Sequence, residues 1–291
     1  MEGVLISEAK VRANKYTLSD REFSFICKLV YDSTGIVLDE RKREMVYRRL
    51  MRRTRDLRLD SFSDYCKLLK NEEALELPNF TNAITTNLTS FFRESHHFDH
   101  LRDVMLPDML KQQRRENDGR RLRIWSSACS TGEEPYSTAI TLLEALGSEI
   151  SSWDARILAT DLDSNVVATG SAGVYKEDRI KDLDARLQRK WFHEGLGDNR
   201  GFVKVDKKMS QLITFKTLNL LHDWPMQGPF DVIFCRNVMI YFDKETQHKL
   251  ILRYFDLLRP GGLLFLGHSE SMPKEISQFE FLGKTMFRRP E

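Results

Sequence analysis

The chain has 291 residues, of which 41% are hydrophobic and 30% are charged, with a formal net charge of +2. This composition is typical of a globular protein that buries a sizeable core, and so small a net charge argues against a general nucleic-acid binder. No apolar stretch has the length of a membrane span or the pattern of a signal peptide, and the four cysteines lack metal-ligand or disulfide spacing. We therefore expect a cytoplasmic protein with reduced thiols and no membrane insertion.

The first part of the chain has the apolar spacing of short helices. Ser19 and Glu22 have the spacing of a capping box, and Gly35 is expected to end the helix that they begin. Further helices are expected from about Asp39, over residues 62–69, and over residues 80–88 after an interruption at Pro78. Together they predict an all-helical N-terminal domain over residues 1–85.

The second of these helices is strongly basic. Its cationic residues are Arg41, Lys42, Arg43, Arg48, Arg49, Arg52, Arg53, Arg55 and Arg58, opposed only by Glu44 and Asp56. Such a local excess of charge predicts either a docking surface for an acidic partner or a solvated helix face.

The pattern changes after about residue 120, where short apolar runs alternate with helical stretches. The expected strands cover residues 122–128, 156–160, 213–218, 230–235 and 262–266. Apolar strands that alternate with helices indicate an α/β fold, with a mostly parallel sheet covered on both faces. Residues 173–212 break this rhythm with a helical stretch, a glycine-rich run and alternating apolar residues, which predict an inserted antiparallel hairpin.

Ligands of open parallel sheets bind at the carboxyl ends of the strands, so the residues that follow each strand are candidates for a site. The loop after the first strand contains Gly132, followed by Glu133 and Glu134 at the expected start of a helix. Asp161 ends the second strand, where a carboxylate can accept both hydroxyls of a ribose. The loop alone leaves two interpretations open: acidic caps of a helix, or a site for a cationic cofactor. A dinucleotide site is disfavoured, since the full glycine motif is absent and carboxylates repel a pyrophosphate.

The strand over residues 230–234 leads into Arg236 and Asn237, two polar residues that a buried core would not explain. Tyr241, a little further on, suits core packing as well as a site. The Pro-Gly-Gly sequence over residues 260–262 predicts a turn before the last strand, of a kind common in methyltransferases and elsewhere.

Three longer motifs make the pattern specific: TNLTSFFRE over residues 86–94, STGEEPYS over 130–137 and FCRNVMIYF over 234–242. In this order they resemble the CheR family of chemotaxis receptor glutamate O-methyltransferases, and the resemblance extends from about Leu18 to Phe287. It implies a class I, Rossmann-like methyltransferase domain over residues 86–291, with a small antiparallel β-subdomain inserted at about 173–212. The domain over residues 1–85 would be the helical N-terminal domain of that family.

The resemblance also implies S-adenosylmethionine as the methyl donor, with S-adenosylhomocysteine as the product. The implied cofactor contacts are Asn87, Thr89, Arg93, Glu134, Asp161, Asn219, Leu220, Arg236 and Asn237. Arg93 and Tyr241 match the residues nearest the transferred methyl group, although Arg93 would serve equally to hold the carboxylate of the cofactor. Glu133 is the alternative to Glu134 at the helix start.

The implied partners are chemotaxis receptors, whose acidic methylation helices would dock on Arg49, Arg52, Arg53 and Arg55. The hairpin resembles the loop with which some members bind an aromatic-containing pentapeptide at the receptor C-terminus, implying contacts at Gly195, Gly197, Gly201 and Val203. We expect the strand edge at residues 203–205 to accept that peptide. The alternative is an ordinary hairpin without a ligand.

Three alternatives fit the sequence less well. A degenerate methyltransferase fold used only for binding is disfavoured, because Asp161, Arg236, Asn237 and Tyr241 are all present. A nucleic-acid methyltransferase is disfavoured, because the strand-end motif lacks the Pro-Pro-aromatic form. His96, Asp99 and His100 could share a helix face as metal ligands, but a solvated surface explains them better, so we expect no metal and no nucleic acid.

Overall fold

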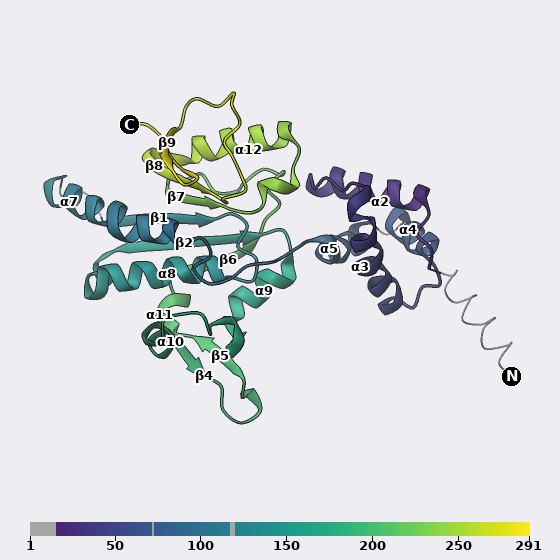
Figure 1. The fold of residues 1–291 in the computed structure, drawn as a ribbon, viewed down its shortest axis with the longest axis horizontal. Helices are drawn as coiled ribbons and strands as arrows, with labels where there is room; N and C mark the ends of the chain where they lie inside the picture. Colours follow the sequence, from purple (N-terminus) through teal and green to yellow (C-terminus); the bar gives the residue numbers. More distant parts are fainter. Residues whose placement is uncertain (1–15, 72, 117–119) are drawn as a thin grey trace, which may run out of the picture. The chain divides into compact units, whose positions relative to one another are not determined.

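The computed structural model describes residues 16–71, 73–116 and 120–291, which form two compact units (Figure 1). The first unit contains the described residues up to Thr86 together with Tyr241–Asp243. The second unit contains Asn87–Ile240 and Lys244–Glu291.

The first unit is helical, as the sequence predicts. Its helices are α2 (Asp20–Thr34), η1 (Glu40–Lys42), α3 (Arg43–Asp56), α4 (Phe62–Asn71) and α5 (Glu73–Ile84). Each helix turns one apolar stripe inward, and the stripes meet in a separate core that buries Ile26, Leu50, Phe62 and Phe80.

Local signals account for most of the helix ends in this unit. The capping box of Ser19 and Glu22 is confirmed: the Glu22 backbone N–H donates to Ser19 Oγ at 3.3 Å, and the Ser19 N–H donates to the Glu22 carboxylate at 2.8 Å. Gly35 ends α2 with a φ of 71°, as predicted. The predicted interruption at Pro78 is wrong, because α5 continues through Pro78 and ends at Ile84. The missing N–H of proline removes one hydrogen bond, and burial of Phe80 and Ile84 favours the continuous helix.

The second unit is built on a seven-stranded sheet with the order β6-β2-β1-β7-β8-β10-β9. Its strands are β1 (Arg121–Ser126), β2 (Asp154–Asp161), β6 (Ile213–Thr217), β7 (Phe230–Cys235), β8 (Leu258–Leu266), β9 (Glu280–Gly283) and β10 (Met286–Arg288). The first five strands of the spatial order are parallel, and β10 and β9 complete the sheet in antiparallel pairing. The prediction of an α/β fold with a mostly parallel sheet is confirmed.

Helices cover both faces of this sheet, and α8 and α12 lie on opposite sides of it in Figure 1. The helices of the unit are α6 (His96–His100), the π-helical turn η2 (Leu101–Met105), α7 (Leu106–Glu116), α8 (Glu133–Leu146), η3 (Gly147–Ser152), α9 (Ser164–Ala172), η4 (Glu177–Arg179), α10 (Ala185–Trp191), η5 (Gly197–Asn199), α11 (Lys207–Ser210), η6 (Met239–Tyr241, which ends in the first unit) and α12 (Lys244–Leu257). Because both faces are covered, β7 is buried along its whole length, which explains its continuous apolar sequence.

The residues between β2 and β6 in the sequence form a second, three-stranded sheet, which confirms the predicted β-subdomain. Its strands β3 (Val174–Lys176), β4 (Phe192–Glu194) and β5 (Phe202–Val205) are antiparallel in the order β3-β5-β4. The expected free edge at residues 203–205 is wrong, because β5 is the central strand and pairs with a neighbour on each side. The edges of this sheet are β3 and β4.

The Pro-Gly-Gly sequence also differs from its predicted place. It lies inside β8 rather than before it, since Leu258 already pairs with Phe230, and the next pair is Leu263 with Val232. The extra residues loop out of the strand at Gly261, whose φ is 71°. In the described part of the chain, no helix is both long and apolar enough to cross a membrane.

Candidate functional site

The strand order reverses at β1, which lies between β2 and β7. The chain leaves β1 toward β2 and β6 on one side, and later returns to the other side through β7 and β8. Crevices at such a reversal are where open α/β sheets bind ligands. The loops that follow β1, β2 and β7 meet at this edge and carry most of the polar residues that the sequence predicts as a site.

Asp161 is the last residue of β2, and its side chain is held at the strand end by backbone groups. Its carboxylate accepts hydrogen bonds from the Ser130 N–H at 2.8 Å and the Asp163 N–H at 3.0 Å. Burial raises the pKa of Asp161 to about 6, although these N–H groups act in the opposite direction. Hydrogen bonds from the hydroxyl groups of a ligand would stabilise the ionised form of such a buried carboxylate.

Asn87 lies beside this strand end, although it precedes β1 by more than thirty residues. Its side-chain amide donates to Asp163 Oδ2 at 2.7 Å, and its carbonyl oxygen accepts from Ser130 Oγ at 3.1 Å. The segment over residues 87–94 therefore lies along the same edge as the strand ends. Strand-end reasoning misses this segment, and only the resemblance of its motif indicates it.

Glu134 and Arg236 form a buried ion pair across the edge, from the start of α8 to the end of β7. Arg236 Nη1 donates to Glu134 Oε2 at 2.9 Å, and Ser126 Oγ donates to Glu134 Oε1 at 2.7 Å. Burial raises the pKa of the Glu134 carboxyl, and the charge of Arg236 opposes that rise. This pair joins the predicted helix start after the first strand to a residue that is predicted to follow the strand over residues 230–234.

Arg236 also holds the segment that contains Arg93. Its guanidinium lies 3.1 Å from the Glu94 carboxylate and donates to the backbone carbonyl of Arg93. Its Nε atom is buried without a hydrogen-bond partner, so one donor of this buried cation is left over at the edge. Arg93 itself is a half-buried residue, and its guanidinium donates to the Leu88 carbonyl at 2.9 Å.

Glu94 is a residue of this site that the sequence does not single out. It bonds Arg236 and also accepts from His268, through Nδ1 at 3.0 Å and the backbone N–H at 3.2 Å. Burial opposes its ionisation, but the hydrogen bond from His268 and the charge of Arg236 lower the pKa of Glu94 to about 2. Its position directly after Arg93 in the first motif is the one sequence signal for it.

The two glutamates at the start of α8 have different partners. Glu133 is fully buried and pairs with Arg179, whereas Glu134 pairs with Arg236. Both carboxylates are buried at the helix N-terminus, where a pyrophosphate would need free backbone N–H groups and positive potential. The geometry therefore disfavours the dinucleotide mode of binding.

Asn237 follows Arg236 in a left-handed conformation with a φ of 58°. Its N–H donates to Glu270 at 2.9 Å, and the same carboxylate accepts from the N–H groups of Met239 at 2.7 Å and Gly267 at 2.6 Å. Glu270 thus joins the loops after β7 and β8. Sequence reasoning misses it because its partners come from two distant loops.

Asn219 and Leu220 come just after β6, at the same end of the sheet. The Asn219 side chain accepts from the Leu221 N–H at 3.0 Å, which shapes the turn after the strand. Leu220 is buried, and its carbonyl accepts from Arg253 at 2.7 Å. Thr89 is half-buried, and its carbonyl accepts from Arg179 at 2.8 Å.

Tyr241 belongs to the first unit and is not among the residues gathered within the second. Its carbonyl accepts from the Val37 N–H at 2.8 Å, and Lys42 Nζ lies 5.5 Å from the centre of its ring. The side chain is half-buried.

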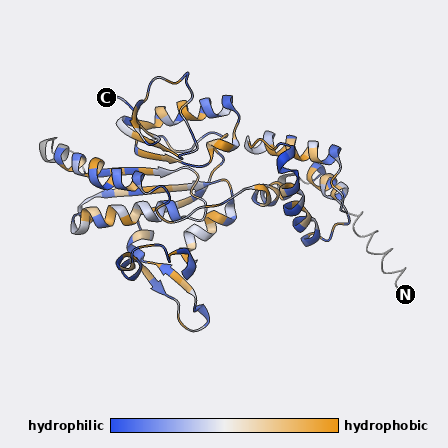
Figure 2. Ribbon diagram, viewed as in Figure 1, coloured by the Kyte–Doolittle hydropathy of each residue, from blue (hydrophilic) through white to orange (hydrophobic). Residues whose placement is uncertain are grey.

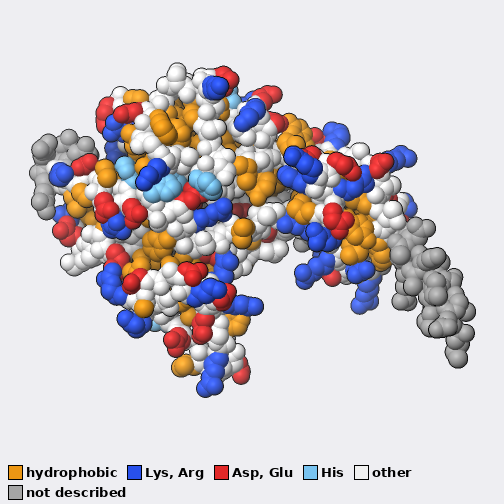
Figure 3. Space-filling view, in the orientation of Figure 1, with side chains coloured by type: hydrophobic (Ala, Val, Ile, Leu, Met, Phe, Trp, Pro, Cys, Tyr) orange, Lys and Arg blue, Asp and Glu red, His pale blue; other side chains and the backbone are white. Residues whose placement is uncertain are grey.

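The four arginines of α3 that the resemblance implies as a docking surface fall into two pairs. Arg49 donates to the carbonyls of Ile84 and Thr85, and Arg53 makes a two-pronged bond to the buried carboxylate of Glu76. Arg52 and Arg55 are exposed, on a helix that Figure 2 shows as strongly hydrophilic. Arg48 extends their exposed stripe at helical spacing, on a unit whose surface carries many basic side chains in Figure 3.

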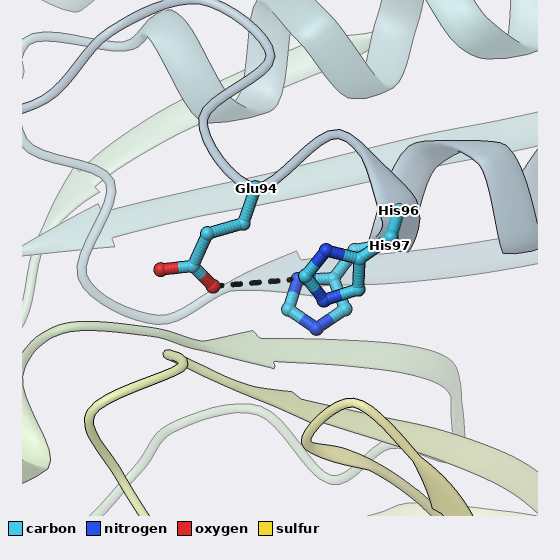
Figure 4. Close-up of side chains that lie close together, drawn as sticks. All are labelled: Glu94, His96 and His97. Atoms are coloured by element: carbon cyan, nitrogen blue, oxygen red, sulfur yellow. Dashed lines mark ion pairs between the residues drawn. The ribbon is translucent and has the colours of Figure 1, made fainter.

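In the described residues, Glu94, His96 and His97 bring possible metal-ligand atoms close together (Figure 4). This is a different set from His96, Asp99 and His100, which the sequence suggested. His97 Nδ1 lies 3.9 Å from Glu94 and has no hydrogen-bond partner. However, the same Glu94 oxygen pairs with Arg236, and the charge of a buried arginine opposes a divalent cation there.

The small sheet carries a pocket of about 470 Å³ between η4, α10 and the strands β4 and β5. Apolar side chains of Ile180, Phe192 and Val203 line it, beside charged groups that include Lys181 and Arg189. The glycines that the resemblance implies as contacts of the receptor peptide, Gly195, Gly197 and Gly201, lie in the neighbouring hairpin loop. Gly201 has a φ of 83°, and a Cβ at Gly195 would clash with the Asn199 carbonyl, so both positions require glycine.

Comparison with known proteins shows similarity over nearly the whole chain. Residues 21–85 match the family model described as the CheR methyltransferase all-alpha domain, and residues 87–288 match the CheR methyltransferase SAM binding domain. The chain is 46% identical over 275 residues to chemotaxis protein methyltransferase 2 of Pseudomonas aeruginosa, covering 94% of this chain and 93% of the relative. It is 43% identical over 275 residues to the chemotaxis protein methyltransferase of Salmonella typhimurium, covering 94% and 91%. Its likeness to the corresponding protein of Escherichia coli is 42% over 275 residues, covering 94% and 92%.

Proposed function

The chain belongs to the CheR methyltransferase family, and we propose that it methylates glutamate side chains of chemotaxis receptors. The family makes it an S-adenosylmethionine-dependent methyltransferase of the chemotaxis type. The proposal adds the acceptor, a glutamate carboxylate that becomes a methyl ester, and the receptors as the proteins that carry it.

The observation that supports this most is that the similarity covers both parts of the family. The helical domain and the cofactor domain each match a family model. The relatives with 42–46% identity carry the name chemotaxis protein methyltransferase, and the similarity covers almost their full length. A methyltransferase fold on its own would leave the acceptor open, because one fold serves many acceptors. The helical domain is the part specific to this family.

We assign the cofactor to the edge of the sheet where β1, β2 and β7 end. Asp161 would accept the ribose hydroxyls, and the Glu134–Arg236 pair would set the charge near the amino-acid end of the cofactor. To Asn87, Thr89, Asn219, Leu220 and Asn237 we assign the cofactor contacts that the resemblance implies. The arrangement suits this ligand, because buried carboxylates stand where a sulfonium or an ammonium would be stabilised.

The proposed reaction needs no general base. When bound, S-adenosylmethionine supplies an electrophilic methyl group, and a glutamate carboxylate with an ordinary pKa near 4.3 is already ionised at neutral pH. The task of the protein is therefore to align the two groups and exclude water, for which positioning contributes about 7–11 kcal/mol. We assign Arg93 to the acceptor carboxylate: one of its N–H groups bonds the Leu88 carbonyl, and a guanidinium has five.

The role of Tyr241 stays a prediction that rests on the third motif. Its residue type suits it to shape the approach to a methyl group, because an aromatic ring with a hydroxyl combines an apolar face and a hydrogen-bonding end. The family resemblance, rather than a contact in the second unit, carries this assignment.

For docking of the methylation helices we propose Arg52 and Arg55, with Arg48 beside them. Exposed arginines at helical spacing would steer an acidic helix toward α3. Arg49 and Arg53 were implied by the same resemblance, but their guanidinium groups already bond within the unit. We assign those two to holding α3 in place.

We further propose that the small sheet binds the receptor C-terminal peptide. With β5 in the centre, an extended peptide would add to an edge strand, and β4 borders the pocket that Phe192 and Val203 line. An aromatic side chain suits a pocket with apolar walls and charged groups at its rim. Gly195, Gly197 and Gly201 would shape the loop that covers it.

Incubation of the protein with radiolabelled S-adenosylmethionine and receptor-containing membranes tests the proposal. We expect label on the receptor band, and release of that label as methanol by mild base, which identifies a carboxyl ester. Label that stays on the receptor in base would indicate methylation of nitrogen, and absence of label would indicate another acceptor protein.

A further inference from the structure

Arg179 joins the small sheet to the cofactor edge of the large one. It ends η4, the short helical turn after β3, and its guanidinium reaches two separate parts of that edge. Nε and Nη2 donate to the Glu133 carboxylate at the start of α8, and Nη2 also donates to the Thr89 carbonyl at 2.8 Å.

The partners of Arg179 show that the contact is built into the fold. The side chain of Glu133 is fully buried, whereas that of Arg179 is 39% exposed. A buried carboxylate is costly to ionise without a partner, and Arg179 is the cation that pairs with Glu133. The other Glu133 oxygen accepts from Thr131 Oγ1 at 2.6 Å. The carboxylate therefore links Arg179 to the loop between β1 and α8.

Further contacts connect the small sheet to the same two segments. Tyr175 of β3 donates its hydroxyl to the Thr131 carbonyl at 2.7 Å, and a Cβ at Gly132 would lie only 2.9 Å from that hydroxyl. The ring of Phe91 packs edge-on against Tyr175 at 5.2 Å and against Phe192 at 5.3 Å. Phe91 belongs to the segment that carries Asn87 and Arg93.

We propose that Arg179 is a positioning residue for the cofactor, through which the small sheet holds the segment over residues 87–94 against the loop over 130–134. It touches no reacting atom. Its fork-shaped guanidinium bonds Glu133 and Thr89 at once, which a single ammonium group does less well. The small sheet is then part of the cofactor site in addition to the receptor-peptide role proposed above.

Arg186 provides a control at another position on the same helix. It also comes from the insertion and also pairs with a glutamate of α8, Glu144, at 2.8 Å. Glu144 lies eleven residues after Glu133, about 16 Å further along the helix and away from the cofactor edge. Loss of the Arg186 pair removes a link between the insertion and α8 without touching the cofactor segments.

The test is calorimetric titration with S-adenosylhomocysteine of the wild type, Arg179→Lys, the double variant Arg179→Ala/Glu133→Gln, and Arg186→Ala. Arg179→Lys keeps a positive charge beside the buried Glu133, and the double variant removes both charges, so each avoids an unpaired buried carboxylate. We expect about tenfold weaker binding in both Arg179 variants and binding within about twofold of wild type in Arg186→Ala.

A purely structural role is distinguished by kinetics and by melting temperature. Positioning of the cofactor predicts a raised KM for S-adenosylmethionine with kcat nearly unchanged at saturation, and a melting temperature similar to that of Arg186→Ala. Binding in both Arg179 variants within about twofold of wild type would overturn the proposal, as would an equal loss in Arg186→Ala. The inference rests on the proposed cofactor site, but this titration needs no receptor, so its failure is distinct from a failure of receptor methylation.

Discussion

Asp161 is the residue through which the assignment of the cofactor is tested most simply. Its carboxylate already has two backbone N–H donors, and we propose that the ribose hydroxyls are the remaining ones. Asp161→Ala removes charge-assisted hydrogen bonds of about 1.5–3 kcal/mol, so the affinity for S-adenosylhomocysteine should fall at least about tenfold. Calorimetry on the folded variant measures this, and an unchanged affinity would remove Asp161 from the site.

The same residue predicts how cofactor binding depends on pH. Burial raises the pKa of Asp161 to about 6, and only the ionised carboxylate accepts both hydroxyls. Affinity should therefore approach its full value well above pH 6 and fall as the pH drops through about 6, by up to about tenfold per pH unit below it. In Asp161→Asn this dependence should disappear. An equal pH dependence in the variant would assign it to other carboxyls, such as Glu134.

Residues of the site that directly follow a strand were predictable from the sequence, whereas residues whose hydrogen-bond partners lie in distant loops were not. Asp161, Arg236 and Asn237 come directly after apolar runs, so their place at the sheet edge follows from the strand pattern. Glu94 and Glu270 take their roles from partners in distant loops, and no periodicity in the sequence indicates such pairs. Of the residues that do not follow a strand, the motif resemblance supplied Asn87, Thr89 and Arg93, but it did not supply Glu94 or Glu270.

At the scale of the helix, α3 divides its arginines between structure and surface. Arg53 is a quarter exposed and pairs with Glu76, whose side chain is 6% exposed. Arg53→Ala leaves that carboxylate unpaired and should lower the free energy of unfolding by about 3 kcal/mol. Denaturant unfolding measures this change, with the exposed neighbour Arg52→Ala as the control, for which we expect a change within about 0.5 kcal/mol. Equal changes in the two variants would contradict the division.

The exposed arginines should instead affect the receptor. The double reversal Arg52→Glu/Arg55→Glu should raise the KM for receptor methylation and weaken its dependence on salt, because charge steering acts on association. Affinity for S-adenosylhomocysteine should stay as in the wild type. The double reversal Arg21→Glu/Lys28→Glu, at two exposed positions of α2, controls for the same change in net charge. Unchanged receptor kinetics at low salt would indicate that this face of α3 is only solvated.

Local chemistry predicts the elements better than their pairing. The capping box of Ser19 and Glu22 and the glycine at position 35 mark the ends of α2 in the sequence alone. The continuation of α5 through Pro78 depends on burial against its neighbours. The central place of β5 depends on its pairing with β3, which is separated from it in the sequence by η4, α10, β4 and η5. Contacts of this kind are tertiary, so the sequence pattern predicted a hairpin but the wrong free edge.

At the scale of the whole molecule, receptor recognition is proposed to use two surfaces, the stripe on α3 and the small sheet. A peptide bound to the small sheet would raise the effective concentration of enzyme near the methylation helices to about the millimolar range. Titration with a receptor C-terminal pentapeptide should show binding that disappears when residues 195–201 are replaced by a two-residue turn. A peptide with its aromatic residue changed to alanine is the control. Binding that persists without the loop would contradict the assignment.

The central claim is that the acceptor is a glutamate carboxylate of a chemotaxis receptor. Tandem mass spectrometry of receptor peptides, after incubation of membranes with S-adenosylmethionine and the purified protein, tests it most directly. We predict the mass of one added methylene on glutamate side chains of the cytoplasmic helices, present with the wild type and reduced with Asp161→Ala. Methyl groups on lysine, arginine or a nucleic acid, with the receptor glutamates unmodified, would contradict the account.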